Sequence, residues 1–310
     1  MSYELVSDEA LADGIRRICQ AEICKAIGIA DGSRETDDTP VHQIRKYLKK
    51  ARAALRLVRK EIGRSAFRQQ DHWLRDAGRL ISEVRDAEVR LETVRQLQSI
   101  KPRRGRAPYA RLEQMLTLEL ENFVAAFAEW QSQTLPLLQQ ARIATETWTV
   151  AHFDARQLRR AVQASYKRAR SSLHAARKDP VPKCFHEFRT TAKVLSYQLR
   201  ILRPINPVVL RNLADELKAV GELLGRAHDL TFLEERLRRD DSNRDTAWHR
   251  ESEKLLAVLE VSQSDLHRAA ADLAERFFAE RARDFGARID AWLHDWTAAK
   301  TDSVAEALVS

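Results

Sequence analysis

The chain has 310 residues, 44% of them hydrophobic and 32% charged, which is the composition of a globular protein with enough length for a real hydrophobic core. Its 53 Lys and Arg exceed its 45 Asp and Glu by eight, so an excess of positive charge is available to an anionic partner. Only nine Gly and eight Pro occur, too few for a sheet-rich fold with many tight turns, and helix formers dominate, so the predicted fold class is all-α.

The first half of the chain is predicted to form four helical regions. Thr39 and Pro40 provide an N-cap and a first helical residue, and Gly63 provides a stop, so the second region has clear ends. A basic loop is expected at 101–108, and Pro136 is expected to bend or break the fourth region. The predicted regions are residues 7–27, 40–62, 65–99 and 109–148.

The second half of the chain repeats this order of helices. Breaks are expected at 179–182 and at the pair Pro204 and Pro207. The tail after Lys300 is expected to be loose. The predicted helical regions are residues 154–178, 182–203, 207–240 and a last long region that ends near 296.

Each half carries a row of cationic residues along one predicted helix. The first row is His42, Arg45, Lys49, Arg52, Arg56 and Arg59, at intervals of three and four residues, which places all six on one helical face. The second row, 144 residues later, is His186, Arg189, Lys193, Arg200 and Arg203, with Ser196 in the remaining slot. A cationic face built twice indicates an extended anionic ligand.

An apolar stripe lies one residue before each row, about 100° around the helix, and is expected to pack into the core. The cationic rows then lie on the flank, where the wall of a groove would be. Like charges at this spacing cost about 1–2 kcal/mol along the first helix, and no acidic residue relieves them between Val41 and Lys60. From His42 to Arg59 the row spans about 26 Å, which suits a chain of phosphates.

The repeat extends beyond the rows. Trp148 and Trp292 are also 144 residues apart, and the pairs Arg85-Asp86 and His228-Asp229 are 143 apart. One long repeat predicts a pseudo-two-fold molecule with halves at 7–150 and 151–298, followed by a flexible tail at 299–310. Asp86 and Asp229 are expected on the neighbouring helix of each half, where they either brace arginines or lie on the surface.

Two copies of His-x-x-Arg-x-x-x-Lys in a helical chain resemble the CHAD family, the conserved histidine α-helical domain. The stretch from Tyr166 to Arg170 and the residues Leu224 and Gly225 are also similar to that family. The resemblance spans 7–298 as a single domain. It implies two four-helix bundles of long antiparallel helices related by a pseudo-two-fold axis, with a basic groove or channel between them.

The resemblance implies that the chain binds inorganic polyphosphate and associates with polyphosphate granules. The two rows are then the binding residues, together with Arg16, Lys167 and Arg170 from the helices that open each half. Ser196 and the weak match at Arg16 depart from the family pattern. Lys46 and Lys50 lie off the first row, so charge reversal there should weaken binding far less than at Arg45 and Lys49.

Four alternatives remain open from the sequence. A single basic helix is usually only a solvated face, although the repetition argues against this here. Nucleic acid is the second alternative, since its backbone also attracts a cationic row, but few aromatic side chains are placed to stack on bases. A metal site or a phosphohistidine enzyme is the third, but no ligand spacing and no Gly-rich phosphate loop accompany the histidines. An acidic protein partner is the fourth.

The sequence therefore predicts a non-catalytic binding protein with no cofactor and no metal. No basic segment followed by an apolar stretch opens the chain, and no run of eighteen apolar residues occurs, so a soluble cytoplasmic protein is expected. The cysteines Cys19, Cys24 and Cys184 have neither metal-site nor disulfide spacing and are expected to be reduced.

Overall fold

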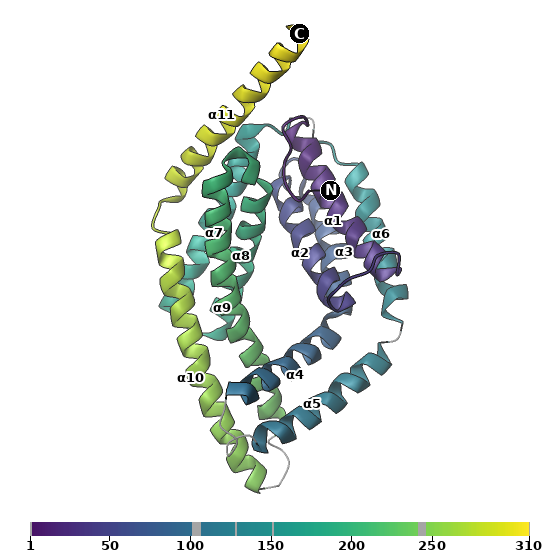
Figure 1. Cartoon of the computed structure of the whole chain (residues 1–310), viewed down its shortest axis with the longest axis vertical. Coiled ribbons are helices and arrows are strands. Elements are labelled where there is room, and N and C mark those ends of the chain that lie inside the picture. The colour runs from purple at the N-terminus through teal and green to yellow at the C-terminus, as the bar shows by residue number, and fades with distance from the viewer. Residues whose placement is uncertain (1, 101–106, 128, 151, 241–245, 310) are drawn as a thin grey trace.

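A computed structural model of the chain describes residues 2–100, 107–127, 129–150, 152–240 and 246–309. Over these ranges the protein has eleven α-helices, one short 3-10 helix and no β-strand, so the all-α prediction is confirmed (Figure 1). No helix in the described ranges is both long and apolar enough to cross a membrane.

Six helices form the first part of the chain, and two of the breaks between them differ from the prediction: the break between α3 and α4 was not predicted, and the break between α5 and α6 was predicted at Pro136. α1 packs on α2 and α6, α3 packs on α2 and α6, and α4 packs on α5. The bounds are α1 Leu11–Ala30, α2 Pro40–Leu57, α3 Arg64–Leu80, α4 Ser82–Ile100, α5 Ala107–Ala126 and α6 Trp130–Glu146.

The remaining helices are longer. α8 packs between α7 and α9, α10 runs along α9, and α11 packs on α7 (Figure 1). The 3-10 helix Arg203–Ile205 follows α8, where Pro204 and Pro207 were expected to interrupt the helical pattern. The bounds are α7 Ala155–Lys178, α8 Pro182–Ile201, α9 Pro207–Asp240, α10 Thr246–Phe277 and α11 Ala282–Val309.

The predicted helix starts are built from local hydrogen bonds. The Thr39 side chain accepts a hydrogen bond from the His42 backbone N–H, and Pro40 is the first residue of α2. Asp154 and Gln157 form a capping box at the start of α7. Gly63, with φ of +82°, separates α2 from α3, as its conformational freedom allows.

Three predicted helical regions are wrong in their breaks or ends. The region 65–99 is two helices because Ile81, fully buried, takes a non-helical conformation. Residues before it pack into one hydrophobic cluster, while Leu91 and Val94 pack into another, so the chain must change direction here. Pro136 lies inside α6 and the break falls between Ala126 and Trp130 instead. The last predicted region is two helices, α10 and α11, with a break at 278–281, and α11 continues as helix to Val309, beyond residue 296.

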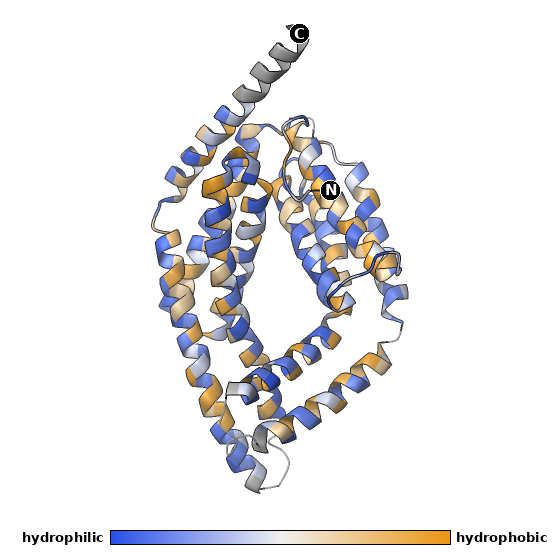
Figure 2. Ribbon diagram, viewed as in Figure 1, coloured by the Kyte–Doolittle hydropathy of each residue, from blue (hydrophilic) through white to orange (hydrophobic). Residues whose placement is uncertain are grey.

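The predicted basic loop at 101–108 falls outside the described residues, apart from 107 and 108, which begin α5. The side chains of residues 299–310 are also outside the description. Hydrophobic and hydrophilic residues alternate around the described helices, as amphipathic helices of a folded core require (Figure 2).

Two hydrophobic clusters hold the helices together. The larger contains buried residues of α1, α2, α3, α6, α7, α8 and α11, of the first half of α9 and the last part of α10, and Val84 of α4. The smaller joins α4 and α5 to the second half of α9 and the first half of α10. The two halves of the chain therefore meet in two places: α2 packs on α8, and α4 packs on α9 (Figure 1).

The contact between α2 and α8 joins the two helices that carry the cationic rows. The Gln198 side chain of α8 is buried and donates a hydrogen bond from Nε2 to the Ala53 carbonyl of α2, at 3.2 Å. The N-terminal segment also spans the two halves, since the Leu5 backbone N–H donates to the Ile201 carbonyl at 3.0 Å. These bonds fix how the two cationic helices lie relative to each other.

Candidate functional site

The two cationic rows lie on α2 and α8, the helices that pack against each other. The predicted apolar stripes are buried on both helices, which confirms that each row lies on the flank of its helix. The buried stripe residues are Val41, Ile44, Leu48, Ala51, Leu55, Val58 and Ile62 in α2 and just after it, and Phe185, Phe188, Ala192, Leu195, Leu199 and Leu202 in α8 and just after it.

Five cationic side chains gather where the N-terminal parts of α2 and α8 meet α4. This cation cluster consists of Arg45, Lys49, Arg85, Arg189 and Lys193. Burial, reinforced by the other four members, lowers the pKa of Lys49 to about 7. Lys49 nevertheless stays exposed to solvent, so an anion can reach it. Burial and Arg189 lower the pKa of Lys193 to about 8.

Within the described part of the chain, the α2 and α8 members of the cation cluster have no close acidic partner, whereas Arg85 of α4 pairs with Glu88 of the same helix at 3.2 Å. Among the described residues, no carboxylate oxygen lies within 4.0 Å of Arg45, Lys49, Arg189 or Lys193. Asp86 of α4 and Asp229 of α9 act on the cluster from further away, and burial raises the pKa of both carboxyls despite the neighbouring arginines. Asp86 and Asp229 therefore offset part of the positive charge without a direct ion pair to the α2 and α8 members of the cluster, in the ranges that the structure describes.

Two of the three arginines of the cluster, Arg45 and Arg189, are held by few hydrogen bonds within the protein. Arg45 donates one hydrogen bond from Nη1 to the Gly78 carbonyl, at 3.3 Å. The Nε atom of Arg189 is buried and has no hydrogen-bond partner among the described residues. A buried guanidinium nitrogen without a partner costs free energy, and an incoming anion would satisfy it.

Two glycines of α9 make room for the α8 cations. A Cβ atom at Gly225 would lie 3.7 Å from Nη2 of Arg189, and one at Gly221 would lie 3.4 Å from Cε of Lys193. Larger side chains at these positions would displace both cations. Gly225, which resembled the family pattern in the sequence, thus has a packing reason.

Three histidines border the cation cluster and are neutral near pH 7. His186 of α8 and His228 of α9 lie with ring centroids 4.7 Å apart. Burial, then Arg189 and His186, lower the pKa of His228 to about 3. Burial and nearby Arg85 lower the pKa of His42, whose Nε2 lies 3.5 Å from Asp38. Neutral imidazoles here offer hydrogen bonds without adding to the charge.

The later residues of the rows have partners within the protein. Arg52 and Arg56 face Asp71 of α3, and Arg203 pairs with Glu4 of the N-terminal segment. Arg59 lies over the Phe67 ring at 4.9 Å from its centroid. Arg200 lies close enough to Tyr197 to act on its pKa, and Arg16 of α1 pairs with Asp13 at 2.6 Å. The structure therefore separates the first part of each row from the rest.

Lys167 and Arg170 of α7 lie apart from the cation cluster. They line a cavity of about 620 Å³ whose other walls include Phe278 and Ala282, at the junction of α10 and α11. Arg170 donates from Nε to the Phe278 carbonyl at 3.0 Å. Their predicted role in binding the same ligand as the α2 and α8 rows stays a prediction.

Sequence reasoning omitted Arg85 and His228 from the candidate site. Both stand directly before Asp86 and Asp229, in the two pairs that are 143 residues apart. That repeated pairing was the available signal, since it indicated that both residues recur at equivalent places beside the rows.

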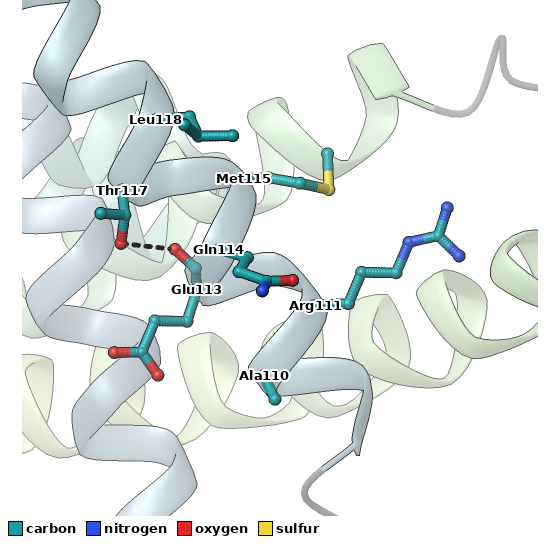
Figure 3. A pocket seen from close by; sticks show the side chains of 7 residues that line it. All are labelled: Ala110, Arg111, Glu113, Gln114, Met115, Thr117 and Leu118. Atoms are coloured by element: carbon teal, nitrogen blue, oxygen red, sulfur yellow. Dashed lines mark hydrogen bonds between the residues drawn. The ribbon is translucent and has the colours of Figure 1, made fainter.

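A second cavity, of about 920 Å³, lies along α5 and has a different character (Figure 3). All seven of its lining residues come from that one helix, and Arg111 and Glu113 are its only charged residues. None belongs to α2 or α8. Its open, mixed surface does not concentrate positive charge, so it is a weaker candidate site for an anion than the cation cluster.

Among the described residues, no three His, Cys, Asp or Glu side chains come together in a way that could hold a metal ion. The chemistry that the cation cluster offers is charge-assisted hydrogen bonding to an anion with several oxygens. Arginine gives paired N–H donors in a fixed geometry, and lysine gives a compact charge.

Comparison with known proteins identifies the family and the fold of the chain. The family profile described as CHAD domain matches residues 18–238. The fold is similar to that of PptA from Streptomyces chartreusis, with 15% identity, a TM-score of 0.62, and coverage of 87% of this chain and 99% of that one. It is also similar to the CHAD domain from the plant Ricinus communis, with 18% identity, a TM-score of 0.57, and coverage of 95% of each chain. A search of curated protein sequences finds no significant match.

Proposed function

Because the chain belongs to the CHAD domain family, we propose that it binds inorganic polyphosphate at the cation cluster and catalyses no reaction on it. The observation that carries this proposal is the set of five cations from α2, α4 and α8 that gathers with no carboxylate within 4.0 Å of its α2 and α8 members, among the described residues. Assembling such charges is costly, and the cost is recovered when a polyanion enters.

The proposed binding mode follows from the donors present. Arg45 and Arg189 contact neighbouring phosphate groups through paired N–H donors, with Lys49 and Lys193 one helical turn further along. The histidines bordering the cluster donate hydrogen bonds to phosphate oxygens. No base-stacking platform is needed, since polyphosphate consists only of backbone phosphates.

The proposal includes the two-fold organisation expected from the sequence. Residues 7–298 form one domain of two four-helix bundles related by a pseudo-two-fold repeat, and a basic groove lies between them. Support comes from the matched roles of Arg45 and Arg189, of Lys49 and Lys193, and of Asp86 and Asp229 around one cluster. Association with polyphosphate granules in the cytoplasm would follow from such binding.

Binding of long-chain polyphosphate at near-physiological salt tests the proposal directly. We expect calorimetry to detect tight binding, and single- and double-stranded DNA to compete poorly, because the cation cluster is confined and lacks groups that recognise bases. Triphosphate serves as the short competitor. Equal or tighter binding of DNA would contradict the proposal and assign the cluster to nucleic-acid backbones.

Binding of polyphosphate should take up about one proton per protein near pH 8. Lys49, with a pKa of about 7, and Lys193, with a pKa of about 8, are partly neutral in the free protein at that pH. The bound anion favours their charged forms and raises both pKa values. Affinity should therefore fall as the pH rises above about 7, until the lysines of the complex also lose their protons.

Calorimetry in two buffers with different ionisation enthalpies measures this proton uptake. The variant Lys49→Arg keeps the charge but does not titrate, so it should bind polyphosphate with a clearly smaller uptake. An uptake that is unchanged in this variant would show that Lys49 is not the titrating group.

A further inference from the structure

The cationic row of α2 continues beyond the cation cluster, and one acidic residue of α3 closes on its next two arginines. Arg52 donates from Nε to Oδ1 of Asp71 at 2.8 Å and from Nη2 to Oδ2 at 3.1 Å. Arg56 places its Nη2 atom 3.6 Å from Oδ1 of the same carboxylate. Arg56 also donates from Nη1 to the Arg52 carbonyl, at 3.0 Å. Asp71 thus holds two arginines of the row in place.

The positive charge around Asp71 exceeds what one carboxylate neutralises. Burial and then Arg52 lower the pKa of Arg56 to about 10; Asp71 opposes this change, whereas Arg168 of α7 and Arg59 add to it. Burial opposes ionisation of Asp71, but hydrogen bonding to Arg52 and the charge of Arg56 outweigh it and lower the pKa of the carboxyl. Asp71 is therefore ionised at neutral pH, and the group around it remains cationic.

The first and the later residues of the α2 row differ in whether a carboxylate of the protein already lies beside them. Lys49 and Arg45 have no carboxylate within 4.0 Å among the described residues, so an anion meets them without competition. The Arg52 and Arg56 side chains are 26% exposed and that of Asp71 is 17% exposed, and an anion that takes the Nε and Nη2 donors of Arg52 must displace the Asp71 carboxylate from them. From Arg45 to Arg56 the helix rises about 16 Å, a distance that several linked phosphates can span and a single phosphate group cannot.

We propose that Asp71 sets the chain-length preference of the site, because a short anion fills the cation cluster alone while a long polyanion also displaces Asp71 from Arg52 and Arg56. This inference rests on the proposed function. A phosphate chain already anchored at the cation cluster presents its next groups to Arg52 at a high effective concentration, which a free short anion lacks. Asp71 is a positioning residue, and it acts through the two arginines.

The test compares long-chain polyphosphate with triphosphate on the variant Asp71→Asn, by calorimetry at several salt concentrations. We expect the affinity for long chains to rise about 10-fold, equivalent to one charge-assisted hydrogen bond, and the affinity for triphosphate to change less than about 2-fold. The slope of log affinity against log salt should steepen by about one for long chains only, because one more phosphate is neutralised.

Asp76→Asn is the matched control. Asp76 lies on the same helix, is partly buried, and also stands beside arginines, with Arg75 at 3.5 Å and Arg79 at 3.9 Å. The Asp76→Asn variant removes the same charge as Asp71→Asn, but Asp76 does not contact the α2 row. The control should leave the affinities for both ligands within about 2-fold of the wild type, because charges this far from a ligand are screened.

An equal gain for both ligands, or the same gain in Asp76→Asn, would overturn the inference in favour of a general effect of net charge. If Asp71→Asn lowers the melting temperature, Arg56→Gln replaces it. That variant keeps the paired bonds of Arg52 with Asp71, and it should weaken long-chain binding without affecting triphosphate. Wild-type binding with no difference in these variants refutes this inference alone, whereas a wild-type chain that binds neither ligand refutes the proposed function.

Discussion

Charge reversal of Arg45 and Lys49 to Glu should lower the affinity for long-chain polyphosphate by more than about 100-fold. Two charge-assisted hydrogen bonds of about 1.5 kcal/mol each account for a loss of this size, and the introduced carboxylates would add repulsion. The double variant should still fold, because each new carboxylate lies among Arg85, Arg189 and Lys193, and the last two have no carboxylate within 4.0 Å among the described residues. Calorimetry or a competition assay at fixed salt measures the change.

The control for this variant must change the net charge equally without touching the cation cluster. Lys60, after α2, and Arg211, in α9, are both exposed, so reversal of both to Glu is suitable. Lys46 is also exposed, but Lys50 is not a neutral position as the sequence suggested: its ammonium lies 3.4 Å from the buried carboxylate of Glu22. An equal loss of affinity in the Lys60 and Arg211 variant would contradict a localised site.

Replacement of Tyr166 by Ala should destabilise the fold by about 3–5 kcal/mol, the usual cost of removing a fully buried aromatic side chain. The Tyr166 ring is inaccessible to solvent and stacks on Phe285, with ring centroids 4.1 Å apart. Its hydroxyl donates to the Glu280 carbonyl at 2.9 Å and lies 3.3 Å from the Phe277 carbonyl. Tyr166 thereby ties α7 to the connection between α10 and α11.

Urea denaturation measures this loss through the midpoint and slope of unfolding. Tyr166→Phe keeps the ring and removes only the hydroxyl, so it should cost about 1 kcal/mol. A loss below about 1 kcal/mol for Tyr166→Ala would show that the connection is held by other contacts. Because α7 contributes no residue to the cation cluster, the Phe variant should keep its affinity for polyphosphate.

The cationic residues of the two rows fall into groups, and this grouping affects how the protein would bind a polyphosphate chain. Among the described residues, the α2 and α8 members of the cation cluster lack close acidic partners, whereas Arg85 pairs with Glu88, the later arginines of α2 are held by Asp71, and Arg203 is held by Glu4. A polyanion therefore meets one part of the surface directly and the other parts only after exchange of an internal ion pair. This arrangement favours an ordered encounter, first at the cation cluster and then along α2.

The features that the sequence predicted are local. A period of three and four residues places Arg45 and Lys49 on one face because helical geometry is the same in every helix. The helix starts at Thr39 and Asp154 were also readable, since a cap and its helix are within a few residues of each other. The family resemblance arose from the same local motif, repeated 144 residues later, and the match over residues 18–238 confirms it.

The sequence by itself thus determined an all-α chain with two cationic helical faces beside two apolar stripes. The tertiary structure alone decided that Ile81 breaks the third helix, that Arg85 joins the cluster, that Asp71 neutralises Arg52, and that Lys167 lines a separate cavity. The physical reason is that periodicity fixes the face on which a side chain lies, but not which helix will face it. A charge is free or paired according to neighbours that are distant in sequence, and only the packing of helices brings them within hydrogen-bonding distance.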